Sequence, residues 1–244
     1  MWREKKVSVI FPTYNEKKSI YSAILNFFAS GYVDEVIVVN NNAISGTDEE
    51  VKKTPAKLVY EKRQGYGYAI WRGFKEAIGE IIIISEPDGT FEGKDVVKLL
   101  AYSDDFPAVF GTRTTSILIW SGANMGWLLR AGNILVAKLI EFLFDTTTLT
   151  DVGCTMKLFK REAIKRIENQ FTVGGSHFGP ELMLLTILNG IRFIEIPVNY
   201  KKRVGVSSVT GNKIIAFFLG FIMIGLIFKY RIRTWFDYNR RCKK

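Results

Sequence analysis

Two acidic side chains, one residue apart, follow directly on a run of aliphatic residues. The stretch "IIIISEPDGTF" begins with four isoleucines and then presents Glu86 and Asp88. In an extended segment such side chains point to the same side, and two close carboxylates repel unless a cation joins them. Mg²⁺ and Mn²⁺ take oxygen ligands of this kind and usually share them with substrate phosphates. A metal–diphosphate site is one interpretation; a solvated acidic turn is the other, because "PDG" is a strong turn signal.

The elements that would position these acids alternate between strand and helix patterns. Strands are expected at 6–11, 35–39, 57–62, 80–85 and 108–112, and helices at 18–30, 66–79 and 94–103. Near-continuous β-branched runs between helices predict an α/β fold whose sheet is mostly parallel and covered by helices on both faces.

Polar clusters follow four of the expected strands. They are "PTYNE", "NNN", "EPDGT" and "TRT", and each comes where a strand ends. Ligands of parallel sheets bind beyond the carboxyl ends of the strands, so we expect these clusters to meet at one edge of the sheet. That edge is the candidate active site.

The second half of the chain has a different character. Residues 117–144 are largely apolar, which suits an interfacial helix pair as well as a core. A strand at 155–159, a helix at 179–189 and a strand at 192–200 follow. We expect a catalytic domain over 1–205 and a membrane-associated segment over 206–244. The two cysteines lie far apart and belong to no metal-binding pattern, so neither a zinc site nor a disulfide framework is expected.

The positive charge is concentrated at the carboxyl terminus. The formal net charge is +10, and residues 229–244 carry seven Lys or Arg against one acid. The uncharged stretch 214–228 precedes this tail, which favours a membrane at its anionic cytoplasmic face. Nucleic acid is the competing partner of a basic tail, but no base-reading module is recognisable. We therefore expect a membrane partner and no nucleic acid.

The apolar stretch 214–228 is short for a transmembrane helix. Its 15 residues would extend about 22 Å as a helix, against a hydrocarbon core of about 30 Å. An interfacial or re-entrant helix is the first interpretation. A short span, stabilised in a homodimer, and a buried core helix are the others.

The order of the motifs resembles a known family. "VSVIFPTYNE", "EVIVVNNN", "QGYGYAIWRGF", "EPDGTF", "FGTR", "LTDVGCTMKLFKR" and "RFIEIPVNYKKRVGVSSV" occur in the order found in family 2 glycosyltransferases with a GT-A fold. Within that family the chain resembles the dolichyl- or polyprenyl-phosphate sugar synthases, over about residues 6–205. The resemblance implies a metal-dependent enzyme that uses Mg²⁺ or Mn²⁺.

The resemblance also assigns positions to the nucleotide sugar. They are Pro12, Tyr14, Glu16, Asn40, Asn42, Gly65, Glu86, Asp88 and Arg203. Glu86 and Asp88 match the metal motif, with glutamate in its first position. Asn40 and Asn42 stand where the family usually has aspartates; they can still form hydrogen bonds but bring no charge.

Besides Asp88, three further residues are implied in catalysis. Arg113 matches the arginine that stabilises phosphate charge. Arg130 interrupts an apolar region, so it either meets an anion or extends to a membrane interface. Asp151 would be the general base if the acceptor is a sugar hydroxyl, and would orient Arg130 or the acceptor if a phosphate attacks. Glu181 is placed near the acceptor by the same resemblance.

Three functions are compatible with these motifs. The first is inverting transfer of a hexose from GDP-mannose or UDP-glucose to a polyprenyl or dolichyl phosphate at the cytoplasmic membrane face. The second is extension of a lipid-linked saccharide, as in cellulose-synthase-like enzymes. The third is a nucleotide-binding regulator without activity, because Asn40, Asn42 and Glu86 depart from the usual acids.

Overall fold

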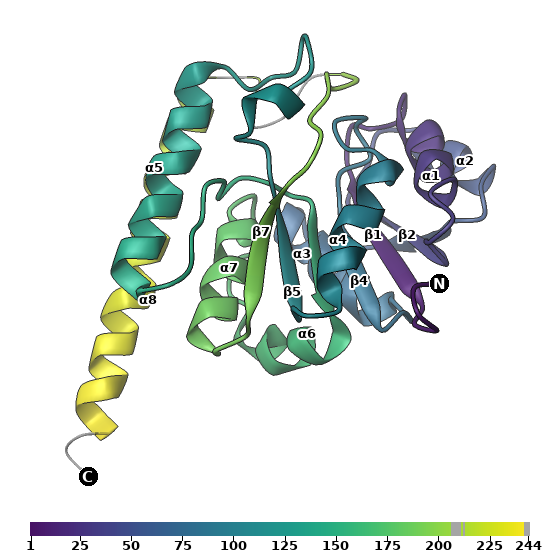
Figure 1. The fold of residues 1–244 in the computed structure, drawn as a ribbon. Coiled ribbons are helices and arrows are strands. Elements are labelled where there is room, and N and C mark those ends of the chain that lie inside the picture. Colours follow the sequence, from purple (N-terminus) through teal and green to yellow (C-terminus); the bar gives the residue numbers. More distant parts are fainter. Residues whose placement is uncertain (206–210, 212, 242–244) are drawn as a thin grey trace.

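A seven-stranded sheet forms the centre of the computed structural model, which describes residues 1–205, 211 and 213–241 (Figure 1). The strands are β1 (Val7–Thr13), β2 (Glu35–Asn40), β3 (Lys57–Tyr60), β4 (Ile81–Ile84), β5 (Ala108–Thr112), β6 (Lys157–Lys160) and β7 (Phe193–Pro197). The helices are α1 (Ile20–Phe28), α2 (Thr47–Lys52), α3 (Tyr66–Glu76), α4 (Val96–Ser103), α5 (Trp127–Phe144), α6 (Arg161–Ile167), α7 (Phe178–Leu188) and α8 (Lys213–Arg241). Short 3₁₀ turns are η1 (Gly93–Asp95), η2 (Ser116–Leu118) and η3 (Glu168–Gln170).

The sheet is mixed but mostly parallel, as the sequence predicts. Its strand order is β3-β2-β1-β4-β6-β5-β7. Strand β6 runs antiparallel to β4 and β5, whereas the other neighbouring strands pair in parallel. The carboxyl ends of β1, β2, β4 and β5 therefore lie along the same edge of the sheet, as expected for the four polar clusters.

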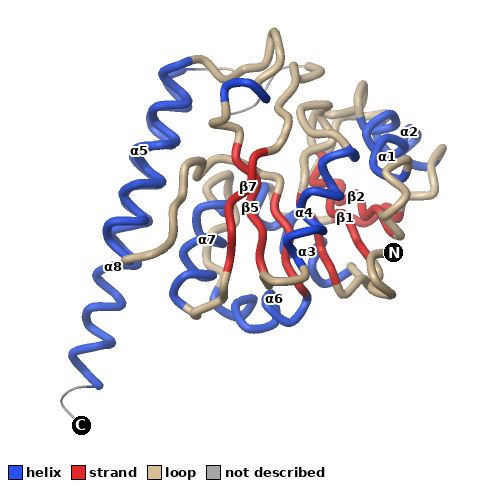
Figure 2. The backbone as a smooth tube through the Cα atoms, viewed as in Figure 1, coloured by secondary structure: helices blue, strands red, loops and turns tan. Residues whose placement is uncertain are grey.

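Helices cover both faces of the sheet (Figure 2). Side chains of β1 alternate: Ile10 packs with α3, α5, α6 and α7 on one face, while Val7, Val9 and Phe11 pack with α1, α2 and α4 on the other. Every residue of β4 is buried, which explains its unbroken isoleucine run, since both of its faces are covered.

The apolar region 117–144 forms one long helix, α5, and not the helix pair that was one of its two interpretations. Helix α5 begins only at Trp127, and η2 is the sole helical turn that precedes it within this range. The segment between them contains Gly122 with φ of +79°, a left-handed conformation that ends a helix, and Ile119 forms a bridge to Tyr200. This segment therefore belongs to the sheet edge rather than to a membrane helix pair.

Helix α8 is longer than the apolar stretch of the sequence. Its segment Ile214–Phe236 has 23 residues and is long and apolar enough to cross a membrane, by length and composition alone. Its middle contacts the catalytic domain, however, because Leu226, Ile227 and Tyr230 are buried in the core that α7 also lines. The segment 206–244 is thus not a detached appendage in the part that the structure describes.

Asp95 holds the chain that leaves β7. Its fully buried carboxylate accepts hydrogen bonds from the backbone N–H and from Nδ2 of Asn199, each 2.8 Å long. It also forms an ion pair with Lys98 at 2.6 Å. This contact fixes where the loop after residue 199 begins, and that loop carries Arg203.

Replacing Asp95 with alanine should lower the free energy of unfolding by about 2–4 kcal/mol, because two buried donors of Asn199 lose their acceptor. Urea denaturation measures this loss. Lys98→Ala is the matched control: its side chain is 38% exposed, so we expect about 1 kcal/mol or less. Equal effects of the two substitutions would contradict this role of Asp95.

Candidate functional site

Asp88 presents one carboxylate oxygen to the sheet edge. It follows β4 and is fully buried. Its Oδ1 accepts hydrogen bonds from the backbone N–H of Thr90 at 2.9 Å and from its hydroxyl at 2.5 Å. These bonds fix the carboxylate, and Oδ2 remains buried without a hydrogen-bond donor in good geometry. A buried carboxylate oxygen of this kind requires a cation.

Glu16 approaches the same place from the loop after β1. Its Oε2 accepts hydrogen bonds from the backbone N–H groups of Tyr14 at 2.7 Å and Asn15 at 2.8 Å. Its other oxygen, Oε1, points away from these donors and meets a guanidinium. "PTYNE" therefore folds into a turn that holds its own glutamate.

Arg203 is the cation that joins the acids. Its guanidinium lies 2.7 Å from Asp88 Oδ2, 2.8 Å from Glu16 Oε1 and 3.5 Å from Glu86 Oε2. Burial would lower the pKa of Arg203, but the three carboxylates outweigh it and raise that pKa. Burial and the charge of Asp88 raise the pKa of Glu86 to about 8.

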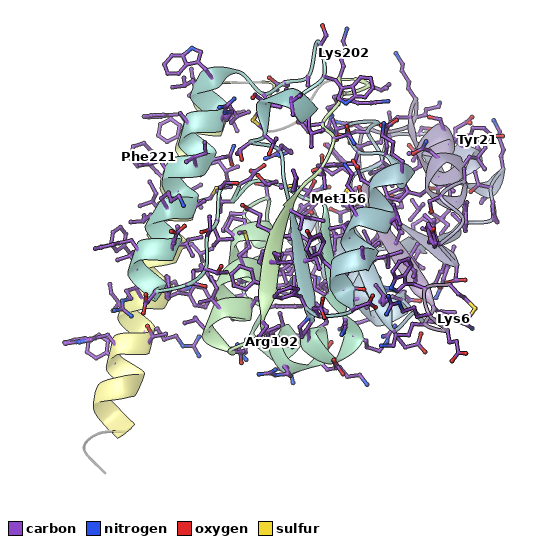
Figure 3. All side chains as sticks on the ribbon, in the orientation of Figure 1. Lys6, Tyr21, Met156, Arg192, Lys202 and Phe221 are labelled. Carbon is purple, nitrogen blue, oxygen red and sulfur yellow. The ribbon has the colours of Figure 1, made fainter. Side chains whose placement is uncertain are left out.

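The loop that carries Arg203 lies along the acidic segment. The backbone N–H of Lys201 donates to the carbonyl of Thr90 at 2.9 Å, and that of Val204 donates to the carbonyl of Asp88 at 2.8 Å. Lys201 also pairs with Glu92. These bonds aim Arg203 at the carboxylates, and Lys202 extends outward at the same end of the molecule (Figure 3). Ser207 and Ser208, further along this loop, lie outside the described residues.

The donor set fits a divalent cation that is shared with a ligand. In the described part of the chain, no three His, Cys, Asp or Glu side chains form a ready-made metal site. A cation held by Glu86 and Asp88 would thus need further oxygens, which is the usual arrangement for Mg²⁺ with substrate phosphates. Asp88 Oδ2, which is buried and pairs with Arg203 at 2.7 Å without a hydrogen bond in good geometry, is the ligand atom that such a cation would take over.

Asn41, the middle residue of "NNN", holds the neighbouring loop through hydrogen bonds to residues 61, 63 and 65. Asn41 is buried; its Oδ1 accepts from the backbone N–H of Gly65 at 2.8 Å, and its Nδ2 donates to the carbonyls of Glu61 and Arg63. The family resemblance assigns Asn40 and Asn42 to the nucleotide and gives Asn41 no role. Alternation along β2 was the missed signal: Ile37 and Val39 face α3, so Asn41 continues on that face.

Asn40 and Asn42 bind neighbouring protein groups in this structure. Asn40 Nδ2 donates to Asp48 Oδ1 at 2.6 Å, and Asn42 Nδ2 donates to Gln64 Oε1 at 2.9 Å. Both side chains support the loops around the sheet edge. Their assignment to the nucleotide stays a prediction.

Arg113 and Asp151 form a two-bonded ion pair. Arg113 Nε lies 2.8 Å from Asp151 Oδ2, and Nη2 lies 2.9 Å from Oδ1. The backbone N–H groups of Arg113 and Gly153 also donate to this carboxylate, at 2.8 and 3.1 Å. The guanidinium carbon of Arg113 lies 5.0 Å from the ring centroid of Tyr200. Asp151, which is fully buried, is thus saturated with donors.

The pKa values of this pair favour its charged form. Burial would lower the pKa of Arg113, but Asp151 outweighs it and holds that pKa well above its usual value. Burial would raise the pKa of Asp151, and Arg113 outweighs it in turn and lowers that pKa. A carboxylate with a lowered pKa and four donors is a poor proton acceptor.

Comparison with known proteins identifies the family. The model of glycosyl transferase family 2 matches residues 8–168. The chain belongs to this family. It is 28% identical over 202 residues to a dolichyl-phosphate hexose transferase of Haloferax volcanii, over 82% of this chain and 84% of that protein. An uncharacterized glycosyltransferase of Mycobacterium tuberculosis is 27% identical over 207 residues, covering 84% of this chain and 90% of that one.

Solved structures confirm the GT-A fold. Glucosyl-3-phosphoglycerate synthase of Mycobacterium tuberculosis in complex with UDP has a TM-score of 0.68 at 17% identity, over 93% of this chain and 80% of that one. The same enzyme with Mn²⁺, UDP and phosphoglyceric acid has a TM-score of 0.66 at 19% identity, over 88% and 78%. The chain is thus a family 2 glycosyltransferase by its sequence, and its fold is the one these structures share.

The structure brings four of the twelve predicted site residues of this transferase into one cluster and pairs two others, Arg113 and Asp151, with each other. Glu16, Glu86, Asp88 and Arg203 meet directly. Arg130, on the first turn of α5, is half-buried, and no described residue forms a hydrogen bond or ion pair with its guanidinium. Its part in catalysis stays a prediction.

Asp151→Asn should destabilise the transferase by about 3–5 kcal/mol, because it leaves the buried Arg113 charge without a counter-ion. The lowered pKa of Asp151 stabilises the fold above the ordinary aspartate pKa of about 4, and this contribution is lost as the pH falls through the folded value. The gap between wild type and variant, measured by urea denaturation, should therefore shrink in acid.

Arg113→Lys is the companion variant. It keeps the charge but cannot form both bonds, so we expect a smaller loss than for Asp151→Asn. A gap that is small at neutral pH, or that widens in acid, would contradict the ion pair as described.

Proposed function

We propose that this transferase moves a hexose from a nucleotide-diphosphate sugar to a polyprenyl or dolichyl phosphate, with inversion at the anomeric carbon. The hydrogen bonds that Asp151 accepts are the observation that favours a phosphate acceptor. A sugar hydroxyl needs a general base, and the acid at the expected position is already saturated by Arg113 and backbone N–H groups. A phosphate acceptor is ionised at neutral pH and needs no base.

Glu86 and Asp88 would hold a divalent cation together with the donor diphosphate. The cation would offset the charge on the leaving diphosphate. Arg203 now neutralises the same carboxylates, at 2.7 Å from Asp88. On this proposal Arg203 leaves Asp88 when the cation binds and its guanidinium turns to the phosphates of the donor, for which its planar fork is suited.

The transfer itself exchanges one bond to the anomeric carbon for another. An oxygen of the acceptor phosphate bonds to that carbon from the face opposite the nucleotide, and the bond to the donor diphosphate breaks. Arg113 is oriented for phosphate charge by Asp151, and the nucleoside diphosphate leaves with the electron pair. The donor is proposed as GDP-mannose or UDP-glucose.

An apolar surface on α5 and α8 supports a lipid acceptor. The two helices contact each other and expose large side chains away from the domain. These include Trp127, Leu128, Leu135 and Phe142 on α5, and Phe217 and Phe221 on α8. Figure 3 shows Phe221 at the outer side of the helix pair. Such a surface suits helices that lie in the membrane interface.

The contacts of α8 favour this interfacial placement over a crossing one. Leu226, Ile227 and Tyr230 lie within the candidate crossing segment and are buried against the catalytic domain. A helix crossing the bilayer would have to withdraw them from the core. With a basic tail behind it, α8 would hold the active site at the cytoplasmic face. The relative from Haloferax volcanii is named for a dolichyl phosphate acceptor.

The test is transfer in vitro to dolichyl phosphate in anionic vesicles, with GDP-mannose or UDP-glucose and Mn²⁺. We expect a dolichyl phosphate hexose, identified by mass spectrometry. Transfer to a dolichyl-linked saccharide but not to dolichyl phosphate would overturn the proposal and favour saccharide extension.

Asp88→Asn should lower turnover in this assay by about 10²–10³-fold, because the cation loses its charged ligand. Titration with Mn²⁺ should show weaker binding in parallel. Asp105→Asn, at an exposed position outside the site, is the control and should keep wild-type turnover. If Asp88→Asn keeps wild-type turnover and Mn²⁺ affinity, Asp88 is not a metal ligand and the assignment is contradicted.

A further inference from the structure

Glu181 is a buried carboxylate outside the acidic cluster of Glu16, Glu86 and Asp88. It lies in the first turn of α7 and is 0% exposed. Its oxygens accept from the backbone N–H groups of Thr172 at 3.1 Å and Val173 at 2.9 Å, and from the Thr172 hydroxyl at 2.5 Å. In the described residues no cation forms an ion pair with it. Its hydrogen bonds go to the segment 172–173, and its expected place near the acceptor stays a prediction.

The segment that Glu181 holds supports the start of α3. The carbonyl of Gly174 accepts from the backbone N–H of Tyr68 at 3.2 Å. A Cβ on Gly65, whose φ is +149°, would lie 2.2 Å from that same carbonyl oxygen, and a Cβ on Gly174 would lie 2.2 Å from the ring of Tyr68. Two backbones therefore touch here, and a shift of Val173–Gly174 must displace the turn at Gly65.

The turn at Gly65 is the proposed donor-nucleotide loop. On its other side, Asn41 Oδ1 accepts from the Gly65 backbone N–H at 2.8 Å. The loop therefore lies between Asn41 at the end of β2 and the segment that Glu181 holds. Its position depends on both supports.

The same carboxylate also receives a side chain from α8. The hydroxyl of Tyr230, 3% exposed, donates to Glu181 Oε1 at 2.7 Å. Tyr230 and Glu181 are 49 positions apart in the sequence. Helix α8, which has an exposed apolar side, and the segment that supports the donor loop therefore both donate hydrogen bonds to Glu181.

We propose that Glu181 is a positioning residue for the donor-nucleotide loop, and that α8 takes part in this support through the Tyr230 hydroxyl. The inference rests on the proposed function, because it takes the turn at Gly65 as part of the donor site. Loss of these bonds lets the segment at 172–174 move, and the donor loop moves with it. Binding of the nucleoside diphosphate weakens, while the acids and arginines that perform transfer keep their places.

Glu181→Gln tests the carboxylate. An amide presents one acceptor and two donors where three donors of Thr172 and Val173 converge, so at least one hydrogen bond is lost. We expect about a tenfold rise in donor KM and in the Kd for GDP or UDP with Mn²⁺, measured by calorimetry, with kcat changed less than about twofold. A role in stability alone would lower the active fraction and hence apparent kcat, and leave KM and Kd unchanged.

Tyr230→Phe tests the contribution of α8. It removes only the hydroxyl, so the carboxylate keeps Thr172 and Val173, and we expect a rise in Kd of about threefold. The double variant should bind no more weakly than Glu181→Gln, because both changes act through one carboxylate. The aromatic cluster of Trp71, Phe171 and Phe178 keeps α3 on α7 in all three variants.

Thr186→Val is the matched control. Thr186 is also buried in α7, and its hydroxyl donates to the carbonyl of Leu182 at 2.7 Å, away from the donor loop. It should leave Kd and KM unchanged. If wild type binds GDP or UDP and the Glu181 and Tyr230 variants bind it equally well, the inference is overturned while the proposed function stands. If the wild type binds neither GDP nor UDP, the inference and the proposed function are both overturned.

Discussion

The site is organised by the crowding of three acidic side chains that face one space, where burial and the charge of Asp88 raise the pKa of Glu86 to about 8. Glu16, Glu86 and Asp88 come from the ends of β1 and β4, which are adjacent in the sheet. Such a group is stable only around a cation, and in this structure the cation is Arg203. The loop of Arg203 is in turn held by backbone bonds to residues 88–90 and by Asp95 through Asn199. The bonds that position this loop therefore also hold Arg203 against the acids.

A second ion pair, between Arg113 and Asp151, has a different consequence. Here each charge has its partner, and four donors saturate the carboxylate. On the proposed function, the pair would fix an arginine for phosphate charge and keep Asp151 from acting as a base. Arg203 would give up its place beside Glu16, Glu86 and Asp88 to a divalent cation, whereas the Arg113–Asp151 pair would stay intact.

Much of the fold could be predicted because it follows from local pattern. The isoleucine run of β4 and the polar clusters after β1, β2, β4 and β5 are short-range signals, and parallel pairing brings their ends together. The closeness of the Glu86 and Asp88 side chains could be predicted for the same reason. Gly122 and Gly126 interrupt the apolar region before α5, a signal that composition alone concealed.

Other features depend on contacts between distant residues. Arg203 meets Glu16, 187 positions away, and Tyr230 meets Glu181, 49 positions away. No periodicity in one segment reports such a partner. Asn41 was missed for a subtler reason: three identical residues carry no difference in type, and only the alternation of β2 shows which one faces Gly65. Asp151 was expected to orient Arg130 or the acceptor, whereas the structure pairs it with Arg113, 38 positions away.

The most direct measurement is Mn²⁺ binding to the protein without nucleotide, by electron paramagnetic resonance, in wild type and Arg203→Ala. Lys202→Ala, next in the chain, removes a charge that forms no ion pair with the three acids among the described contacts. If Arg203 and the divalent cation share one place, Arg203→Ala should bind Mn²⁺ about tenfold more tightly than wild type and than Lys202→Ala. Equal or weaker binding in Arg203→Ala would show that the guanidinium and the metal do not compete, and would contradict the shared cation site.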